Sequence, residues 1–182
     1  MVVCPTDTLY GLAADVFSDT ALERVFAIKA RPPGLALPVL LDSWDQVSLV
    51  ARQVPEVARR LADSFWPGML TLVLSKQAQV PDLVTGAQDT VAVRVPDHPV
   101  PQALIRLLGR PITGTSANRS GEPDLPTLEA VEAQLGSQID YIIRSGPAPK
   151  GISSTVVDVT GAEPKLIRQG GLSFEEILEA LA

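Results

Sequence analysis

Several guanidinium, hydroxyl and amide side chains lie in short polar segments that directly follow apolar runs. PTDT follows VVC, Arg94 lies in VRVPDHP after TVA, TSAN follows PIT, and Arg168 lies in LIRQGG. In mixed α/β sheets, strand ends and the loops after them gather around the ligand crevice. We therefore expect these segments to converge. Arginines supply fixed cations and hydroxyls supply directional hydrogen bonds, which suits a polyanion with a polar appendage.

A second pair of cations lies in IKARPPGLALPVLL, where Lys29 and Arg31 are one residue apart beside an apolar run. Lys29 continues the apolar stripe of a predicted helix. The pair can hold an anion. Taken alone, however, Lys29 also fits a cation that complements the helix dipole, and Arg31 fits a surface ion pair.

Other polar residues have equally plain structural interpretations. Thr6 and Thr8 could close a turn, and Ser116 and Asn118 could stabilise a loop. Arg94 is harder to explain in this way, because it lies between valines in a strand that is otherwise suited to burial.

Common catalytic constellations are missing. GPAPKGISST differs from a phosphate loop, because its lysine precedes the second glycine and two prolines remove backbone donors. A serine triad would need His98, the only histidine, which lies in a turn-like segment where a solvated or capping role is expected. The sequence therefore offers neither the common phosphate-binding loop nor a convincing serine triad.

Composition narrows the class of protein. The 182 residues predict a single domain, residues 1–182, and a hydrophobic content of 46% predicts a compact core. A net charge of −6 disfavours a protein whose whole surface binds nucleic acid. The single cysteine, Cys4, excludes an internal disulfide and a cysteine-rich zinc site. No apolar stretch has the roughly 20 residues of a membrane span, so we expect no membrane contact and a cytoplasmic location.

The expected elements alternate irregularly, which predicts a mixed sheet flanked by helices. Strands are predicted at residues 1–4, 38–41, 69–74, 90–95, 111–114, 141–144, 155–159 and 165–168. Helices are predicted at residues 19–29, 45–52, 55–65, 101–108 and 128–135, and a last one begins at a capping box formed by Ser173 and Glu176.

Together these segments resemble the YrdC/TsaC family of threonylcarbamoyl-adenylate synthases. The matching segments, in the family's order, are PTDTLYGL, KAR, WPGMLTLVL, VAVRVPDHP, SAN, SGEPDLPT, SSTVVD and LIRQG. A single KxR would be uninformative, whereas eight ordered segments over most of the chain are specific. The resemblance implies an α/β fold with a twisted, mixed parallel and antiparallel sheet around a deep basic cleft.

The resemblance also implies a reaction. Family members combine L-threonine, bicarbonate and ATP into threonylcarbamoyl-AMP and pyrophosphate, with Mg²⁺ expected beside ATP. The product serves threonylcarbamoylation of adenosine 37 in tRNA, and a separate transferase carries out that transfer. Direct tRNA binding by this chain would then be weak or absent. The alternative is a non-catalytic RNA-binding or ribosome-assembly protein of the same fold.

Residue roles follow from the matching motifs. The positions that match the family's L-threonine site are Thr8, Arg94, Gly114 and Ser154. The KxR pair, Lys29 and Arg31, would be catalytic and face the nucleotide phosphates. The positions that match the ATP site are Arg31, Thr90, Ser116, Asn118 and Arg168. No metal ligand is assigned. The chain departs from the family pattern at Leu35, Ala36, Leu40 and Asp124.

Overall fold

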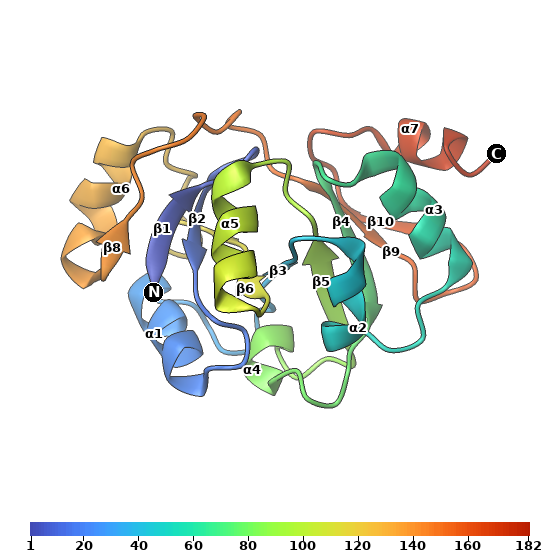
Figure 1. Cartoon of the computed structure of the whole chain (residues 1–182), viewed down its shortest axis with the longest axis horizontal. Helices are drawn as coiled ribbons and strands as arrows, with labels where there is room; N and C mark the ends of the chain where they lie inside the picture. Colours follow the sequence, from blue (N-terminus) through green and yellow to red (C-terminus); the bar gives the residue numbers. More distant parts are fainter.

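The computed structural model describes residues 1–182 and contains two mixed β-sheets (Figure 1). The first has the strand order β7-β2-β1-β8 and consists of β1 (Val2–Pro5), β2 (Tyr10–Ala13), β7 (Thr115–Ser116) and β8 (Tyr141–Ile142). The second has the order β10-β9-β4-β5-β3-β6 and consists of β3 (Val39–Leu40), β4 (Leu70–Ser75), β5 (Thr90–Arg94), β6 (Ile112–Thr113), β9 (Thr155–Asp158) and β10 (Lys165–Arg168).

Both sheets combine parallel and antiparallel pairs, as the irregular order of elements predicts. In the first sheet β1 is antiparallel to β2 and parallel to β8, and in the second β4 is antiparallel to β5 and parallel to β9. The sequence did not reveal β2 or the division into two sheets. The chain passes from β6 to β7, and so from the second sheet to the first, at Gly114. A Cβ there would lie 2.7 Å from the Leu40 side chain, so the crossing requires glycine.

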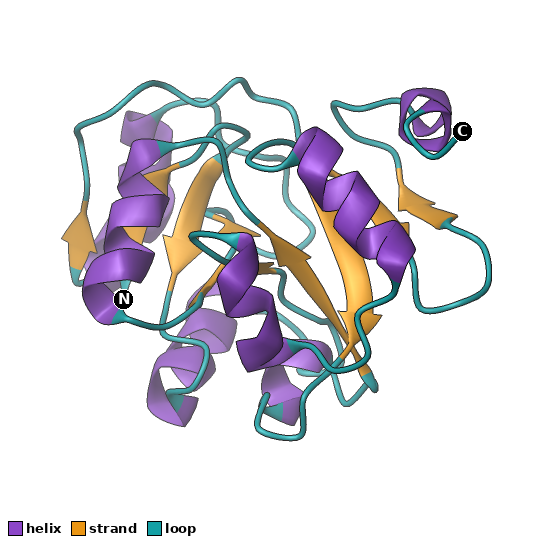
Figure 2. Cartoon of the chain, turned by 45° about the vertical axis from the view of Figure 1, so that its right-hand side comes forward, coloured by secondary structure: helices purple, strands orange, loops and turns teal.

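Helices flank the two sheets (Figures 1 and 2). They are α1 (Asp19–Lys29), α2 (Val47–Val50), α3 (Glu56–Phe65), α4 (Asp82–Thr85), α5 (Pro99–Leu108), α6 (Leu128–Leu135) and α7 (Phe174–Glu179), with short 3₁₀ turns at Trp44–Gln46 and Gly136–Gln138. The predicted helix at residues 45–52 is wrong in extent, because Ala51 is extended and pairs with Lys76. The capping box of Ser173 and Glu176 is confirmed.

The two sheets share their hydrophobic core. The main cluster of 31 buried residues takes members from both, and a smaller cluster contains Cys4 and Ala13 of the first sheet with Leu40 and Ile112 of the second. Ile105 of α5 belongs to that smaller cluster, so this helix packs over the junction. No helix has both the length and the apolar character needed to cross a bilayer.

Candidate active site

A cavity of about 460 Å³ lies between the two sheets, close to the junction under α5. It receives side chains from the turn after β1, from the ends of β5 and β10, and from the loops after α1 and β7. The lining residues are Thr6, Thr8, Leu9, Tyr10, Gly11, Arg31, Ala36, Pro38, Leu40, Thr71, Arg94, Gly114, Thr115, Ser116, Asp124, Ser153, Ser154 and Arg168. The charged residues of the lining are three arginines and one aspartate, so its net charge is positive. The polar segments converge as the sequence predicts.

Arg94 forms the most constrained part of this cavity. Its side chain is buried, and its Nε donates to the carbonyl oxygen of Gly68 at 2.7 Å. One terminal nitrogen donates to Thr8 Oγ1 at 2.9 Å, and the other pairs with the carboxylate of Asp7. Burial lowers the pKa of Arg94 and Asp7 opposes that shift, but an arginine stays charged. A fixed cation therefore faces the cavity.

In the PTDT turn, the two threonines both close the turn and contribute to the cavity, so the structural and the functional interpretation of these residues hold together. Thr6 Oγ1 accepts from the backbone N–H groups of Thr8 and Leu9 at 3.1 Å and donates to the Leu9 carbonyl at 2.7 Å. Thr6 thus closes the turn. Thr8 Oγ1 lies 2.9 Å from Thr6 Oγ1, contacts Arg94 and lines the cavity. The turn and the site use the same two hydroxyls.

Ser154 immediately precedes β9 and lines the same cavity as Arg94. Its hydrogen-bond partner was not predicted from the sequence. Ser154 Oγ lies 2.8 Å from Thr71 Oγ1 on β4, and both residues are buried. Arg168 donates to the Ser154 carbonyl at 2.8 Å and to its Oγ at 3.3 Å. Thr71 could have been noticed as the hydroxyl within the apolar run LTLVL. We name Thr8, Thr71, Arg94 and Ser154 the inner wall.

The opposite side of the cavity is more exposed. Arg31 is half-buried, and it donates to the carbonyls of Leu35 at 3.2 Å and Ala36 at 2.7 Å. Ala36 and Asp124 are both exposed, and the Asp124 carboxylate has no hydrogen-bond partner. We name Arg31, Ala36 and Asp124 the outer wall. Its cation is held only by neutral groups.

Lys29 does not line the cavity. It is 1% exposed, and its Nζ donates to the backbone carbonyl of Ser116 and to Asn118, at 2.6 Å for the carbonyl and 3.2 Å for Oδ1. An ammonium has three donors, and all three are used. Burial lowers the pKa of Lys29 to about 8, with a smaller contribution from nearby Arg31. Lys29 therefore supports the SAN loop from beneath.

Two other predicted site residues also lie away from the lining. Asn118 is buried, and its Nδ2 donates to the carbonyls of Glu122 at 2.7 Å and Pro123 at 3.1 Å, which is the loop-stabilising role. Thr90 begins β5, whereas Arg94 ends it, so the length of the strand separates Thr90 from the cavity. The remaining predicted positions line the cavity: Thr8, Arg31, Arg94, Gly114, Ser116, Ser154 and Arg168.

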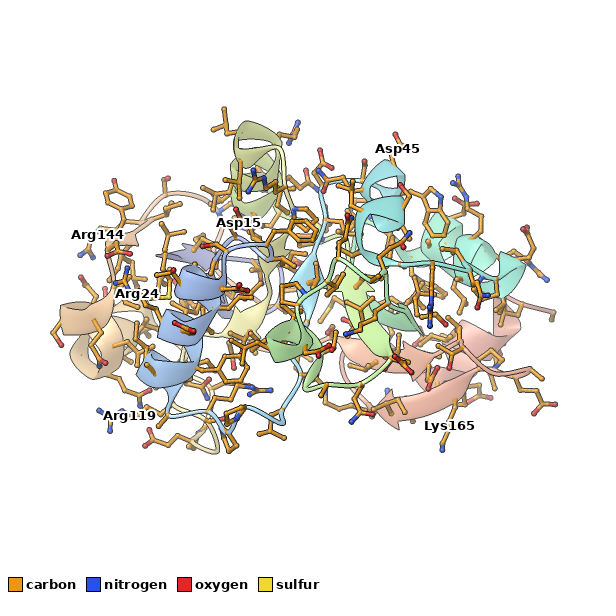
Figure 3. All side chains as sticks on the ribbon, turned by 90° about the horizontal axis from the view of Figure 1, so that it is seen from below. Asp15, Arg24, Asp45, Arg119, Arg144 and Lys165 are labelled. Carbon is orange, nitrogen blue, oxygen red and sulfur yellow. The ribbon has the colours of Figure 1, made fainter.

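His98 does not line the cavity, and both of its ring nitrogens have hydrogen-bond partners elsewhere. It is 3% exposed, so it is not solvated. Its Nδ1 accepts from the Val100 N–H at 3.2 Å and caps α5, while Nε2 lies 3.1 Å from the Pro147 carbonyl. Other cations lie at the periphery (Figure 3), where Arg24 pairs with Asp140 at 2.8 Å and Arg144 pairs with Glu132.

The fold and the cavity define an α/β protein with a cavity of net positive lining between two mixed sheets. The family model Sua5/YciO/YrdC, described as "Telomere recombination", matches residues 1–170. The chain belongs to this family.

Individual relatives agree with this assignment. A threonylcarbamoyl-AMP synthase from Pyrococcus abyssi is 44% identical over 177 residues, which are 97% of this chain and 52% of the relative. One from Vibrio vulnificus is 37% identical over 93% of this chain and 91% of the relative. The crystal structure of P. abyssi Sua5 complexed with L-threonine superposes with a TM-score of 0.95 at 43% identity, over 99% of this chain and 53% of that one. The chain thus spans about half the length of the P. abyssi protein.

Proposed function

We propose that the chain is an ATP-dependent L-threonylcarbamoyladenylate synthase, which makes threonylcarbamoyl-AMP and pyrophosphate from L-threonine, bicarbonate and ATP. One observation carries the proposal. The predicted threonine residues and three of the predicted ATP residues line one cavity, in a chain similar to enzymes that are named for this product. The shared core supports residues 1–182 acting as one domain.

The inner wall suits the amino acid. Arg94 has five N–H hydrogens, and its three contacts use the one on Nε and one on each terminal nitrogen. One hydrogen therefore remains on each terminal nitrogen, and these two N–H groups are free to donate to a carboxylate. The Thr8 and Ser154 hydroxyls lie beside it and supply directional contacts for the rest of threonine.

The outer wall suits the nucleotide. Arg31 of the outer wall supplies positive charge that phosphates require, and two lining residues outside both walls, Arg168 and Ser116, add a second cation and a hydroxyl at the same cavity. Mg²⁺ would be carried mainly by the ATP phosphates, as is usual for this ion. The residues fit that arrangement, because the chain has no cluster of three metal-ligating side chains and Asp124 is the one carboxylate in the lining. Bound there, Mg²⁺ would neutralise charge on the transferring phosphoryl group.

The chemistry needs alignment rather than a protein nucleophile. The threonine amine bonds to the carbon of bicarbonate and water is lost, which gives a carbamate. A carbamate oxygen then attacks the α-phosphorus of ATP while pyrophosphate leaves. Alignment of two anions and neutralisation of their charge can supply much of the acceleration. The cations of the cavity fit this task. The position of His98 outside the cavity also agrees with it, because the reaction needs no histidine to activate a protein nucleophile.

The product would pass to a separate tRNA threonylcarbamoyl transferase, and the reaction would take place in the cytoplasm. Transfer by a separate enzyme agrees with the net charge of −6, because a chain that does not bind tRNA needs no broad basic surface. A non-catalytic RNA-binding role has no comparable support, since the peripheral arginines Arg24 and Arg144 are already paired with carboxylates.

The test is pyrophosphate release by the pure protein with ATP, bicarbonate and Mg²⁺, with and without L-threonine. We expect release that depends on both threonine and bicarbonate. Product identity is checked by mass spectrometry of the adenylate. Release without threonine, or none at all together with tight and salt-sensitive RNA binding, would overturn the proposal.

A further inference from the structure

Asp7 carries the only buried side-chain oxygen that has no hydrogen-bond partner. Asp7 is 6% exposed and lies in the turn between β1 and β2, between the two threonines of PTDT. Its Oδ1 accepts from a terminal nitrogen of Arg94, while Oδ2 is the unpartnered atom. An ionised carboxylate is seldom buried without a reason, because desolvation of the charge is costly.

The position of Asp7 indicates that it acts on Arg94 rather than on a ligand. Arg94 lines the cavity, whereas Asp7 does not. The carboxylate thus contacts the guanidinium without itself lining the cavity. Arg94 belongs to the second sheet and the PTDT turn belongs to the first, so this ion pair connects the two sheets at the cavity.

Three contacts from three directions fix the plane of the guanidinium. Two of the acceptors, the Gly68 carbonyl and Thr8 Oγ1, are neutral, and Asp7 is the only anion among them. Charge-assisted hydrogen bonds are roughly twice as strong as neutral ones, so Asp7 has the largest influence on orientation. Arg168 lies near enough to oppose the charge of Arg94, which adds to the need for a counter-ion.

We propose that Asp7 is a positioning residue for substrate binding: it holds the Arg94 guanidinium so that the two remaining N–H groups face the carboxylate of the amino acid. This inference rests on the proposed function. A purely structural ion pair would stabilise the fold without any preference for one substrate. The two roles therefore differ in their effect on the two KM values.

The first experiment measures steady-state pyrophosphate release by Asp7→Asn, which keeps the size of the side chain and removes its charge. We expect KM for L-threonine to rise about tenfold, because the hydrogen bond that orients Arg94 loses its charge assistance, and KM for ATP to stay within about twofold. The matched control is Asp63→Asn, which breaks an exposed Asp–Arg pair on α3 with an N–O distance of 2.9 Å. Equal changes in both KM values, or a lower kcat alone, would show that Asp7 is only structural.

A double variant keeps the test decisive if Asp7→Asn folds poorly because a buried cation is left unpaired. Asp7→Asn combined with Arg94→Gln removes both charges together. If Asp7 acts through Arg94, adding Asp7→Asn to Arg94→Gln leaves kcat/KM for threonine within about twofold, whereas independent contacts would add. A further tenfold loss in the double variant would mean that Asp7 contacts the substrate itself, and would overturn the inference.

Failure of the inference is distinguishable from failure of the proposed function. An inactive wild-type protein would contradict the proposed function, and L-threonine binding by calorimetry would then test Asp7 directly. We expect Asp7→Asn to weaken that binding about tenfold relative to Asp63→Asn. An active wild type with an unaffected Asp7→Asn would contradict the positioning role alone.

Discussion

The inner and outer walls of the cavity hold their cations in different ways. Arg94 on the inner wall is buried, bound on three sides and paired with a carboxylate, whereas Arg31 on the outer wall is half-buried and contacts only neutral groups. A preorganised cation loses little conformational entropy when a ligand binds, so the inner wall suits a small substrate with few contacts. An adaptable cation suits a larger nucleotide whose phosphates move during the reaction.

The largest expected effect comes from the inner wall. Arg94→Gln removes the buried cation proposed to bind the carboxylate of threonine, a loss that typically costs 2–5 kcal/mol, so kcat/KM for threonine should fall by about 100-fold. Pyrophosphate release at varied threonine measures this. The matched control is Arg106→Gln on the exposed face of α5. A loss below about threefold would show that the inner wall does not bind the amino acid.

Substitutions of Lys29 and of Arg31, which are one residue apart, should affect different properties: the first the stability of the fold, the second the activity. Lys29→Met leaves the buried carbonyls of Ser116 and Asn118 without a donor and should lower the free energy of unfolding by about 3 kcal/mol. Urea unfolding measures this, with Lys165→Met as the control, because Lys165 is exposed on β10 (Figure 3). Unchanged stability would show that Lys29 does not support the loop.

Arg31→Ala is expected to lower activity and to leave stability nearly unchanged, in contrast to Lys29→Met. It removes a cation of the outer wall that supports little of the core, so kcat should fall about tenfold to thirtyfold while the free energy of unfolding changes by less than about 1 kcal/mol. The control is Arg52→Ala, at an exposed position outside the cavity. Full activity of Arg31→Ala would remove Arg31 from the proposed mechanism.

The pH dependence of stability tests the burial of Lys29 further. Its pKa is about 8 when folded, below the ordinary value of 10.5, so between these pH values the unfolded chain binds the extra proton. This term makes the free energy of unfolding rise with pH in that window. Cys4 acts in the opposite direction, because burial raises the pKa of its thiol to about 12. The measurement therefore subtracts the Lys29→Met curve from that of the wild type, and a flat difference would contradict the prediction.

The smallest effect is expected at Asp124, the carboxylate of the outer wall. Asp124→Ser removes a negative charge from a cavity proposed to hold phosphates, and should lower KM for ATP about twofold to fivefold by relieving exposed like-charge repulsion. Asp45→Ser is the control, since Asp45 is exposed in the 3₁₀ turn outside the cavity (Figure 3). A rise in KM that added Mg²⁺ reverses would instead make Asp124 a metal contact.

Local patterns predicted most elements and many of the site residues. The mixed α/β character and the capping box of α7 follow from residue types and spacing, because these features depend on near neighbours. The strand β2 escaped prediction, since it has only four residues and contains Gly11. Asp7 also escaped, because a carboxylate in a turn is ordinary until a distant arginine is placed beside it.

By itself, the sequence determined that cations and hydroxyls follow the strand ends, that Lys29 continues a buried stripe, and that neither a common phosphate loop nor a serine triad matches. Only the tertiary structure decided which cations reach the cavity. Lys29 ends α1, and Ala30 adopts a left-handed conformation with φ of 46°, so Arg31 points in another direction. Thr90 and Arg94 share a strand but lie at opposite ends of it. These outcomes depend on contacts between residues far apart in the chain, which spacing along the sequence does not contain.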